Sequence, residues 1–312
     1  MTDTPPELSI VLPARNEAPA LEKLLPVLRG QFPQAQIIVV NDGSTDDTGA
    51  LCARHGVQEV RHRYSVGNGG AIKSGARAAR GELIVFMDAD GQHDPADIPR
   101  LLARLGEGYD MVVGARDGSS QASVGRSLAN RLYNRVANYM TGQKIADLTS
   151  GFRAVRADRF REFLFLLPNG FSYPTSITMA FFRAGYGVAY EPIVAARRTG
   201  RSHIRPLHDG ARFLLIIFRV ATLYSPLKIF APVSGLSFVA GLVNYLYTYA
   251  NNGRFTNASA VLFTTAVVVF LMGLVSEQIT TLLYATAARE RRDKDCPAGA
   301  RACGRPALGP ND

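Results

Sequence analysis

The chain has 312 residues, of which 47% are hydrophobic, and its formal net charge is +9. This length fits one large domain or two smaller ones, and the positive charge favours anionic partners such as phosphorylated ligands or an acidic membrane surface. We expect no nucleic-acid partner, because the first half has no block of Lys and Arg with interleaved aromatic residues.

The N-terminal sequence MTDTPPELS lacks the basic and apolar regions of a signal peptide. The three cysteines, Cys52, Cys296 and Cys303, form neither a CxxC pair nor a disulfide framework. We therefore expect the globular part of the protein to lie in the reducing cytoplasm.

Short apolar runs alternate with amphipathic stretches in the first part of the chain. Strand-like runs occupy 8–12, 37–40, 83–87 and 111–114, with a weaker one at 57–60, and helical patterns occupy 18–29, 46–54, 71–79 and 95–105. Buried strands separated by helices predict an α/β domain with a mostly parallel central sheet.

Three acidic loops follow three of these strands. They are PARNE at 13–17, NDGSTDD at 41–47 and DADGQHD at 88–94. Ligands bind beyond the carboxyl ends of the strands in parallel sheets, so we expect the three loops to face one crevice.

Asp88 and Asp90 can bring their oxygens to one cation at the end of a buried strand. Mg²⁺ and Mn²⁺ accept a few hard oxygen ligands and take phosphate oxygens for the rest. A calcium loop needs Gly at its sixth position, whereas Gly91 is the fourth, and a zinc site would need more partners than His93. An ordinary solvated turn is the remaining alternative.

The glycine-rich stretch at 65–81 matches neither GxGxxG nor the P-loop pattern. Its glycines favour a tight entry into a helix whose N-terminus faces a phosphate or a sugar. Lys73 either adds a charge to that site or is an exposed helix lysine.

Two uncharged runs, at 229–250 and 255–276, follow in the last third of the chain. A helix over the first would be about 33 Å long, which is enough for a bilayer core of about 30 Å. Basic residues lie outside both runs, whereas the turn at 251–254 contains only Arg254. We therefore expect an integral membrane hairpin in the cytoplasmic membrane with both chain ends in the cytoplasm, rather than two buried core helices. Glu277, near the end of the second span, is expected to be structural.

Arg205, just before the segment 207–224, and Arg212 and Arg219 within it recur at intervals of seven beside apolar residues. This pattern predicts an amphipathic helix at the membrane surface, or else one packed on the globular domain. The predicted organisation is a globular domain at 1–205, an interface segment at 206–228, the two spans within 229–288 (about 229–250 and 255–278), and a basic, disordered tail at 289–312.

Several segments together resemble the inverting family-2 glycosyltransferases, which have the GT-A nucleotide-sugar fold. They are IVLPARNEA (10–18), VVNDGSTDDT (39–48), the long segment 67–95 ending in DADGQHDP, and DLTSGFRAVR (147–156). The last two are the most specific, and they are similar to the polyprenyl-phosphate branch typified by dolichyl-phosphate mannose synthase. The resemblance covers about residues 8 to 205.

The resemblance implies a role for particular residues. The contacts to the base and ribose match Pro13, Glu17 and Asp42, and the ligands of Mg²⁺ or Mn²⁺ and of the diphosphate match Asp88, Asp90 and Gln92. The contacts to the acceptor phosphate match Arg116 and Arg126, with Arg131 as the reserve candidate. A closing loop matches Arg197, Gly200 and Ser202, with His203 in place of a lysine. Asp90, Arg116 and Arg126 are the expected catalytic residues.

The implied reaction moves a sugar from a GDP- or UDP-sugar to a polyprenyl phosphate. A sugar hydroxyl acceptor needs a general base, whereas a phosphate anion can attack the anomeric carbon directly once arginines hold it. We therefore expect Asp147 to anchor the turn before Ser150 and Gly151 rather than to act as a base. Self-association through the hairpin is a further expectation.

Three other functions are weighed against this one. Transfer to a lipid hydroxyl such as diacylglycerol would need a carboxylate base, and a catalytically silent membrane scaffold would bind nucleotide sugars without reaction. Processive polysaccharide synthases are disfavoured because their acceptor signature contains tryptophan and this chain has none.

Overall fold

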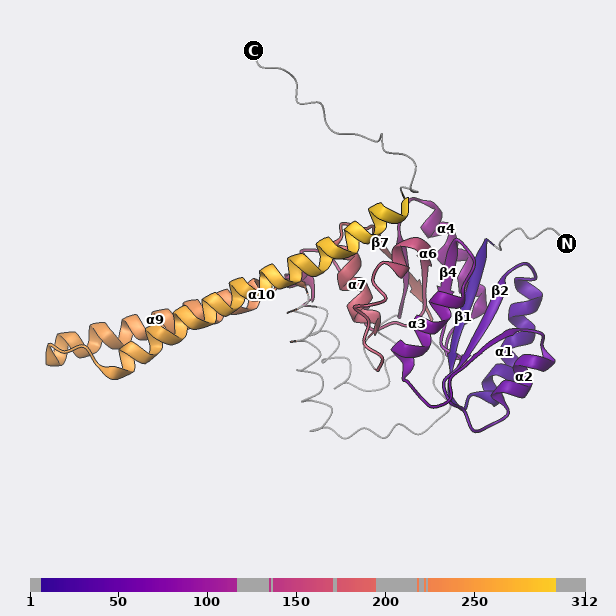
Figure 1. Ribbon diagram of the computed structural model, residues 1–312, viewed down its shortest axis with the longest axis horizontal. Coiled ribbons are helices and arrows are strands. Elements are labelled where there is room, and N and C mark those ends of the chain that lie inside the picture. The colour runs from indigo at the N-terminus through magenta and orange to yellow at the C-terminus, as the bar shows by residue number, and fades with distance from the viewer. Residues whose placement is uncertain are drawn as a thin grey trace, which may run out of the picture.

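The computed structural model describes residues 7–116, 135, 137–170, 173–194, 218, 222 and 224–295. An α/β domain contains the first part of the described chain, and a long helical hairpin projects from it (Figure 1). The amphipathic segment predicted at 206–228 lies mostly outside the described residues.

A seven-stranded sheet in the order β3-β2-β1-β4-β6-β5-β7 forms the centre of the domain. Its strands are β1 (Leu8–Ala14), β2 (Gln36–Asn41), β3 (Gln58–Arg61), β4 (Leu83–Phe86), β5 (Met111–Arg116), β6 (Arg153–Arg156) and β7 (Val188–Ile193). β6 runs antiparallel to both of its neighbours, whereas the other paired strands are parallel. The predicted mostly parallel sheet is confirmed.

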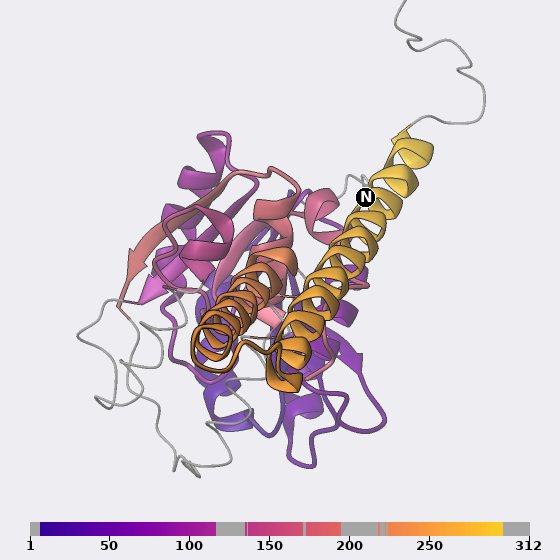
Figure 2. The ribbon, with the colours of Figure 1, turned by 90° about the vertical axis from the view of Figure 1, so that its left-hand side faces the viewer.

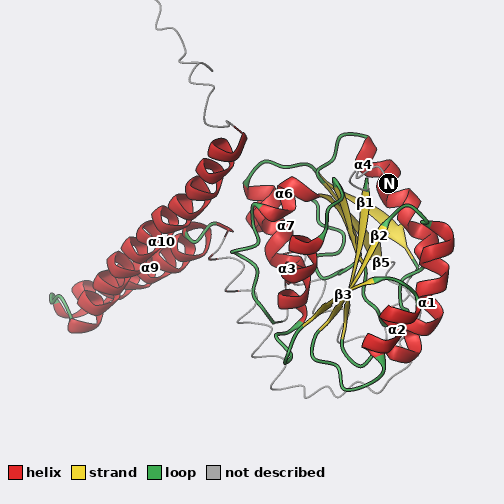
Figure 3. Cartoon of the chain, turned by 45° about the vertical axis from the view of Figure 1, so that its right-hand side comes forward, coloured by secondary structure: helices red, strands yellow, loops and turns green. Residues whose placement is uncertain are grey.

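Helices cover both faces of this sheet (Figure 3). One face carries α1 (Ala18–Gln31), α2 (Thr48–Arg54) and α4 (Ile98–Gly106), which follows a 3₁₀ turn at Pro95–Asp97. The other face carries α3 (Asn68–Ala78), α6 (Ala157–Arg161) and α7 (Tyr173–Arg183). The sequence patterns located each of these helices except α6 and α7.

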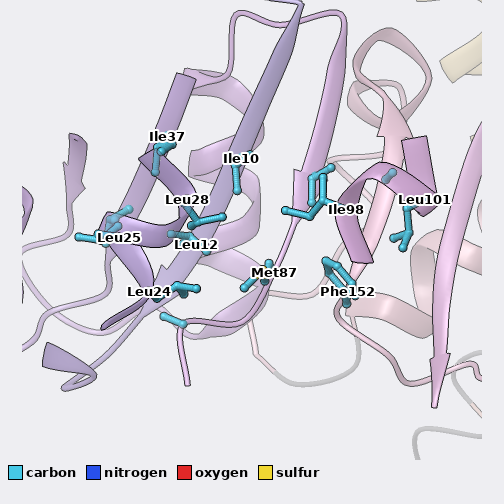
Figure 4. Close-up of a cluster of buried hydrophobic side chains, with 14 of the residues drawn as sticks. Ile10, Leu12, Leu24, Leu25, Leu28, Ile37, Met87, Ile98, Leu101 and Phe152 are labelled. Carbon is cyan, nitrogen blue, oxygen red and sulfur yellow. The ribbon is translucent and has the colours of Figure 1, made fainter. Parts of the chain in front are cut away.

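The core on the first face follows from the alternation of side chains along the strands. Ile10 and Leu12 of β1 point to the same face and pack against Leu24, Leu25 and Leu28 of α1 (Figure 4). All five side chains are at most 7% exposed, and full burial of a leucine or isoleucine stabilises the fold by about 1.5–3 kcal/mol. This packing fixes where β1 ends and therefore where the first acidic loop begins.

The antiparallel strand β6 brings a distant segment to the functional edge of the sheet. Its first residue, Arg153, pairs with Phe86, the last residue of β4, and with Val113 of β5. Because β6 runs in the opposite direction, the loop that precedes it lies at the carboxyl ends of β4 and β5. The DLTSGF segment thus reaches the end of β4, where the DAD segment begins.

The hairpin consists of α9 (Leu227–Asn252) and α10 (Asn257–Asp295), which lie side by side when viewed from the tip (Figure 2). Gly253 ends α9 in the left-handed conformation, with φ of 60°. Both helices are long and apolar enough to cross a membrane, at Leu227–Asn251 and Asn257–Ala285, and little of either span is buried inside the structure. α10 extends past the expected boundary at 288 to Asp295, through the charged sequence RERRDKD, whose Arg, Glu and Lys residues favour helix.

Candidate active site

The acidic loops after β1 and β2 are tied together by hydrogen bonds. Asn16 has φ of 56°, and its side-chain oxygen accepts a hydrogen bond from the Thr45 N–H at 2.8 Å. The Asn16 N–H in turn donates to Ser44 Oγ at 3.0 Å. β1 lies between β2 and β4, so all three acidic loops gather at one edge of the sheet, as the patterns predicted. Pro13 and Glu17 are both half-buried at this edge.

Asp42 is buried at the end of β2 and organises the loop that leads into α3. Its Oδ1 accepts hydrogen bonds from His62 Nδ1 at 2.7 Å and from the Val66 N–H at 2.8 Å. Its Oδ2 accepts from Ser65 Oγ at 2.7 Å and from the Gly67 N–H at 2.9 Å. Burial raises the pKa of Asp42, but these hydrogen bonds outweigh it and lower the pKa to about 2.

The described contacts thus give Asp42 a role in folding the loop at 62–67. An ionised carboxylate only accepts hydrogen bonds, so His62 carries its proton on Nδ1, and in the neutral ring its Nε2 accepts from Ser74 Oγ at 2.9 Å. The predicted contact of Asp42 with the base or the ribose stays a prediction.

The glycine-rich start of α3 faces another loop of the chain, whereas the sequence had led us to expect a ligand there. The Gly69 N–H donates to the Gly170 carbonyl at 3.3 Å, and the Gly70 N–H donates to the Asn169 carbonyl at 2.8 Å. A Cβ at Gly69 would overlap the Pro168 carbonyl oxygen. These glycines therefore allow the loop at 168–170 to pack against the start of α3. The carbonyl groups of that loop accept hydrogen bonds from the free amide groups of the helix.

Lys73 takes part in the same docking. Its Nζ donates to the Leu167 carbonyl at 3.2 Å and to the side-chain oxygen of Asn169. Burial and the neighbouring charge of Arg77 lower the pKa of Lys73. The sequence suggested either a charge at the ligand site or an exposed helix lysine. Lys73 instead binds the loop at 167–169.

The three predicted metal ligands follow β4 directly, and Asp88, Asp90 and Gln92 are all half-buried. Asp90 Oδ1 accepts a hydrogen bond from the Gln92 N–H at 3.2 Å, which folds the segment back on itself. The Asp88 side chain is 35% exposed, and its Oδ2 lies 3.8 Å from Nε2 of His93, whose ring stacks on Phe152 at 4.9 Å between centroids.

This donor set fits a hard divalent cation such as Mg²⁺ or Mn²⁺. Asp88 and Asp90 supply carboxylate oxygens and Gln92 an amide oxygen, and both ions prefer oxygen ligands while keeping several positions for water or phosphate. Among the described residues, no group of three or more His, Cys, Asp and Glu side chains could hold a metal ion.

Gly151 limits the space beside Asp88. A Cβ at this position would lie 2.9 Å from Asp88 Oδ2 and 3.3 Å from Oδ1. The 2.9 Å distance is shorter than real Cβ contacts, so a side chain at position 151 would require the Asp88 carboxylate or the turn to shift.

Arg116 ends β5 and pairs with Asp147. Its Nε donates to Asp147 Oδ2 at 2.8 Å, its Nη2 donates to Oδ1 at 3.2 Å, and Nη2 also donates to Thr149 Oγ1 at 2.6 Å. Burial alone would lower the pKa of Arg116, but the hydrogen bond and charge of Asp147 raise it. The Arg116 side chain remains 30% exposed, whereas that of Asp147 is 8% exposed.

Asp147 also anchors the turn that follows it. Its Oδ1 accepts hydrogen bonds from the Thr149 N–H at 2.9 Å and the Ser150 N–H at 3.1 Å. Burial raises the pKa of Asp147, yet the contacts with Arg116 and Thr149 outweigh it and lower the pKa. These contacts show Asp147 anchoring the turn before Ser150 and Gly151, as predicted, and its exclusion as a general base stays a prediction.

Four predicted site residues cannot be placed. Arg126, Arg131, Arg197 and Ser202 lie outside the described residues. Their expected roles at the acceptor phosphate and in the closing loop stay predictions.

Arg153, behind the turn, is a residue whose role the sequence did not reveal. Its side chain is fully buried, and it donates to the Pro174 carbonyl at 3.2 Å, to Thr178 Oγ1 at 3.2 Å and to the Ser150 carbonyl. Burial lowers its pKa. Arg153 therefore fastens the SGF turn to the start of α7, and the SGFR motif was the signal for a fixed arginine there.

Comparisons with known proteins agree with this geometry. The family model "Glycosyl transferase family 2" matches residues 9–164, and the model "GtrB C-terminal hairpin" matches residues 225–282. The undecaprenyl-phosphate 4-deoxy-4-formamido-L-arabinose transferase of Pseudomonas paraeruginosa is 28% identical over 91% of this chain and 88% of that protein. The undecaprenyl-phosphate mannosyltransferase of Micrococcus luteus is 32% identical over 60% of this chain and 83% of that protein.

Among solved structures, glucosyl-3-phosphoglycerate synthase from Mycobacterium tuberculosis superposes with a TM-score of 0.54. The two chains are 25% identical, and the match covers 68% of this chain and 78% of that one. That structure contains Mn²⁺, uridine diphosphate and glucosyl-3-phosphoglycerate.

Proposed function

The chain belongs to glycosyl transferase family 2, and we propose that it moves a sugar from a nucleotide-diphosphate sugar to a polyprenyl phosphate with inversion at the anomeric carbon. One observation carries this proposal: the segment 147–151 contacts Arg116 at one end and Asp88 at the other. A cation for an acceptor phosphate and a carboxylate for the donor side therefore lie at the two ends of the same turn. The undecaprenyl-phosphate transferases among the relatives support the acceptor class.

The donor would bind along the carboxyl edge of β1, β2 and β4. Pro13, Glu17 and Asp42 lie on the nucleotide side of this edge in our proposal, and Asp88, Asp90 and Gln92 hold a divalent cation against the diphosphate. Bound there, Mg²⁺ or Mn²⁺ would offset the charge that develops on the departing nucleoside diphosphate. The Mn²⁺ and uridine diphosphate in the structural neighbour support a metal at this edge.

The acceptor phosphate would approach the open face of Arg116. Asp147 and Thr149 hold Nε and Nη2 of this arginine, so the guanidinium plane is fixed before the acceptor arrives. Arg126 and Arg131 are the further candidates for this contact. A fixed guanidinium can orient a phosphate oxygen toward the anomeric carbon at little entropic cost.

The contacts of Asp42 and Asp147 make either of them a poor general base for transfer to a lipid hydroxyl. That reaction needs a free carboxylate as a general base. Asp42 receives four hydrogen bonds, and Asp147 is engaged by Arg116 and by the following turn. A phosphate acceptor needs no such base, which agrees with this arrangement.

We further propose that the hairpin crosses the cytoplasmic membrane with the α/β domain and both chain ends in the cytoplasm. Two apolar helices and the GtrB hairpin match support a membrane protein. The orientation rests on the basic residues outside both spans. Reporter fusions at Arg254 and at the C-terminus test it, and a periplasmic C-terminus would reject it.

The test of the reaction uses the purified full-length protein in detergent, polyprenyl phosphate and a panel of nucleotide sugars. We expect one donor to give a mild-acid-labile glycolipid, and both EDTA and Asp90→Ala to abolish its formation. Asp94→Ala is the matched control, since Asp94 accepts a hydrogen bond from the Ala96 N–H in the neighbouring exposed turn. A product with diacylglycerol instead would establish the hydroxyl-acceptor alternative, and donor binding without transfer to either lipid would favour the scaffold.

A further inference from the structure

The base of the hairpin is joined to the α/β domain by a cluster around Glu277. Its carboxylate accepts hydrogen bonds from Arg183 Nη2 at 3.3 Å, from Ser225 Oγ at 3.2 Å and from the Leu227 N–H at 3.3 Å. These donors come from the end of α7, the segment before α9, and the first residue of α9. One carboxylate thus connects both membrane helices to the catalytic domain.

The position of this carboxylate suits the start of α9. The first amide groups of a helix lack partners within the helix and carry partial positive charge. Glu277 satisfies one of them, at Leu227, and places a negative charge there. An ionisable group inside hydrocarbon is costly unless it is paired, and Arg183 pairs with Glu277, which lies within the apolar stretch Asn257–Ala285.

Arg183 is held by more than this ion pair. It donates to Thr281 Oγ1 at 3.3 Å, and its guanidinium lies 5.1 Å from the centre of the Tyr284 ring. Tyr284 packs against the core cluster of the α/β domain, where its ring centre is 6.2 Å from that of Phe163. The Arg183 and Glu277 side chains are only 17% and 24% exposed, so the pair is largely withdrawn from solvent.

The other end of α7 holds the turn of the candidate active site. Tyr173 Oη donates to the Gly151 carbonyl at 3.2 Å, and Thr175 Oγ1 donates to the Leu148 carbonyl at 3.4 Å. The helix has 11 residues and is therefore about 16 Å long, and nine of its residues are buried. A short, packed helix thus connects the hairpin at one end with the turn beside Asp88 at the other.

We propose that Arg183 and Glu277 are positioning residues that hold the catalytic turn at a fixed height above the bilayer, so that a lipid-borne phosphate reaches it. This inference rests on the proposed polyprenyl-phosphate acceptor. A polyprenyl phosphate cannot leave the membrane surface to search for the site. The distance between hairpin and turn must therefore match the depth of the phosphate, and α7 with its ion pair sets that distance.

The experiment compares wild type with Arg183→Gln, Glu277→Gln and the double variant, all full length and in vesicles that contain polyprenyl phosphate. Each single variant should raise the KM for the acceptor roughly tenfold, less than for a fully buried pair because both side chains are partly exposed. The double variant should lose less than the sum of the two single losses, because both changes remove the shared ion pair. The donor KM and the Kd of a fluorescent nucleoside diphosphate should stay unchanged.

A control and a second readout complete the test. Glu22→Gln and Arg54→Gln remove an exposed ion pair of 3.0 Å on the same domain and should change neither constant. Energy transfer from the bound fluorescent nucleotide to a headgroup dye should fall in the Arg183 and Glu277 variants and stay constant in the controls. The inference is overturned if both the acceptor KM and the energy transfer are unchanged in these variants. It is also overturned if the nucleotide Kd rises by the same factor as the acceptor KM. A wild-type protein that transfers no sugar rejects the proposed function instead, and the energy transfer still tests the positioning.

Discussion

Replacement of Asp42 by asparagine tests whether its charge holds the loop at the nucleotide side of the cleft. The carboxylate receives hydrogen bonds from His62, Ser65 and the two amide groups at Val66 and Gly67. The side chain introduced by Asp42→Asn would offer one acceptor oxygen and one NH₂ group to four donors. At least one buried donor would then lose its partner, and the loop would lose its central charge.

The size of the effect follows from the pKa of Asp42, which is about 2 instead of 3.8. At about 1.4 kcal/mol per pKa unit, this difference corresponds to roughly 2 kcal/mol of folding free energy at neutral pH. The folded protein binds the proton more weakly than the unfolded chain. This stabilisation is therefore complete above pH 3.8 and is lost as the pH falls toward about 2.

The assay is equilibrium unfolding of the full-length protein in detergent, followed by circular dichroism from about pH 7 to about pH 3. The variant should be less stable by roughly 2 kcal/mol near pH 7, and the gap between the two proteins should narrow at the acid end. Asp94→Asn, in an exposed turn, is the control and should show no such narrowing. A gap that stays constant over the whole range would refute the argument from charge.

Three further predictions use single side chains. Gly151→Ala puts a Cβ 2.9 Å from Asp88 Oδ2, so Mn²⁺ binding measured by electron paramagnetic resonance should weaken at least about tenfold; unchanged affinity would contradict this. Gly69→Ala should destabilise the protein by more than about 2 kcal/mol in chemical denaturation, because the added Cβ would overlap a backbone carbonyl. The control is Gly106→Ala, whose added Cβ would have no atom within 4 Å and which should stabilise the protein by about 0.4–1 kcal/mol. Asp147→Asn should lower kcat/KM for polyprenyl phosphate at least about tenfold with little change in nucleotide Kd, and an equal loss in both would show a merely structural role.

The strands β1 to β5 could be predicted because they carry their own signal, whereas the parallel strand β7 (Val188–Ile193) was not predicted. Runs such as IIVV and LIVF are apolar on both faces, end in polar loops and alternate with amphipathic stretches. The placement of the acidic loops at one edge then follows from strand direction alone. The membrane hairpin could be predicted for a similar reason, since its length and lack of charge are local properties of the sequence.

The strand β6 and the helix α7 could not be found in this way. β6 is only RAVR, with arginine at both ends, and its first arginine is fully buried by contacts with Pro174 and Thr178 rather than by a carboxylate. A buried arginine looks like a surface residue in any pattern based on polarity. β6 forms between β4 and β5, each of which would otherwise lack a partner on that side. This pairing is a property of the assembled sheet and not of the local sequence.

The roles of the glycines at the start of α3 were also beyond the sequence. The pattern GNGG is equally suited to a phosphate or to a second loop, since both need backbone amides without side chains in the way. Only the fold brings residues 168–170 to this helix end, and their carbonyls occupy the amide groups. The resemblance to a glycosyltransferase was correct, yet it did not tell which glycines meet the ligand and which meet the chain itself.

In the proposed reaction the turn at 147–151 serves the two substrates from opposite ends, and this determines how the effects of changes should divide between them. Asp147 holds Arg116 on the acceptor side, whereas Gly151 lies against Asp88 on the donor side. A change that moves the whole turn, such as loss of the Arg153 contacts beneath it, must disturb donor and acceptor together. A change at the base of the hairpin leaves the turn intact and alters only its distance from the lipid. The ratio of the two KM values therefore distinguishes a displaced turn from a displaced domain, even where the loss of activity is the same.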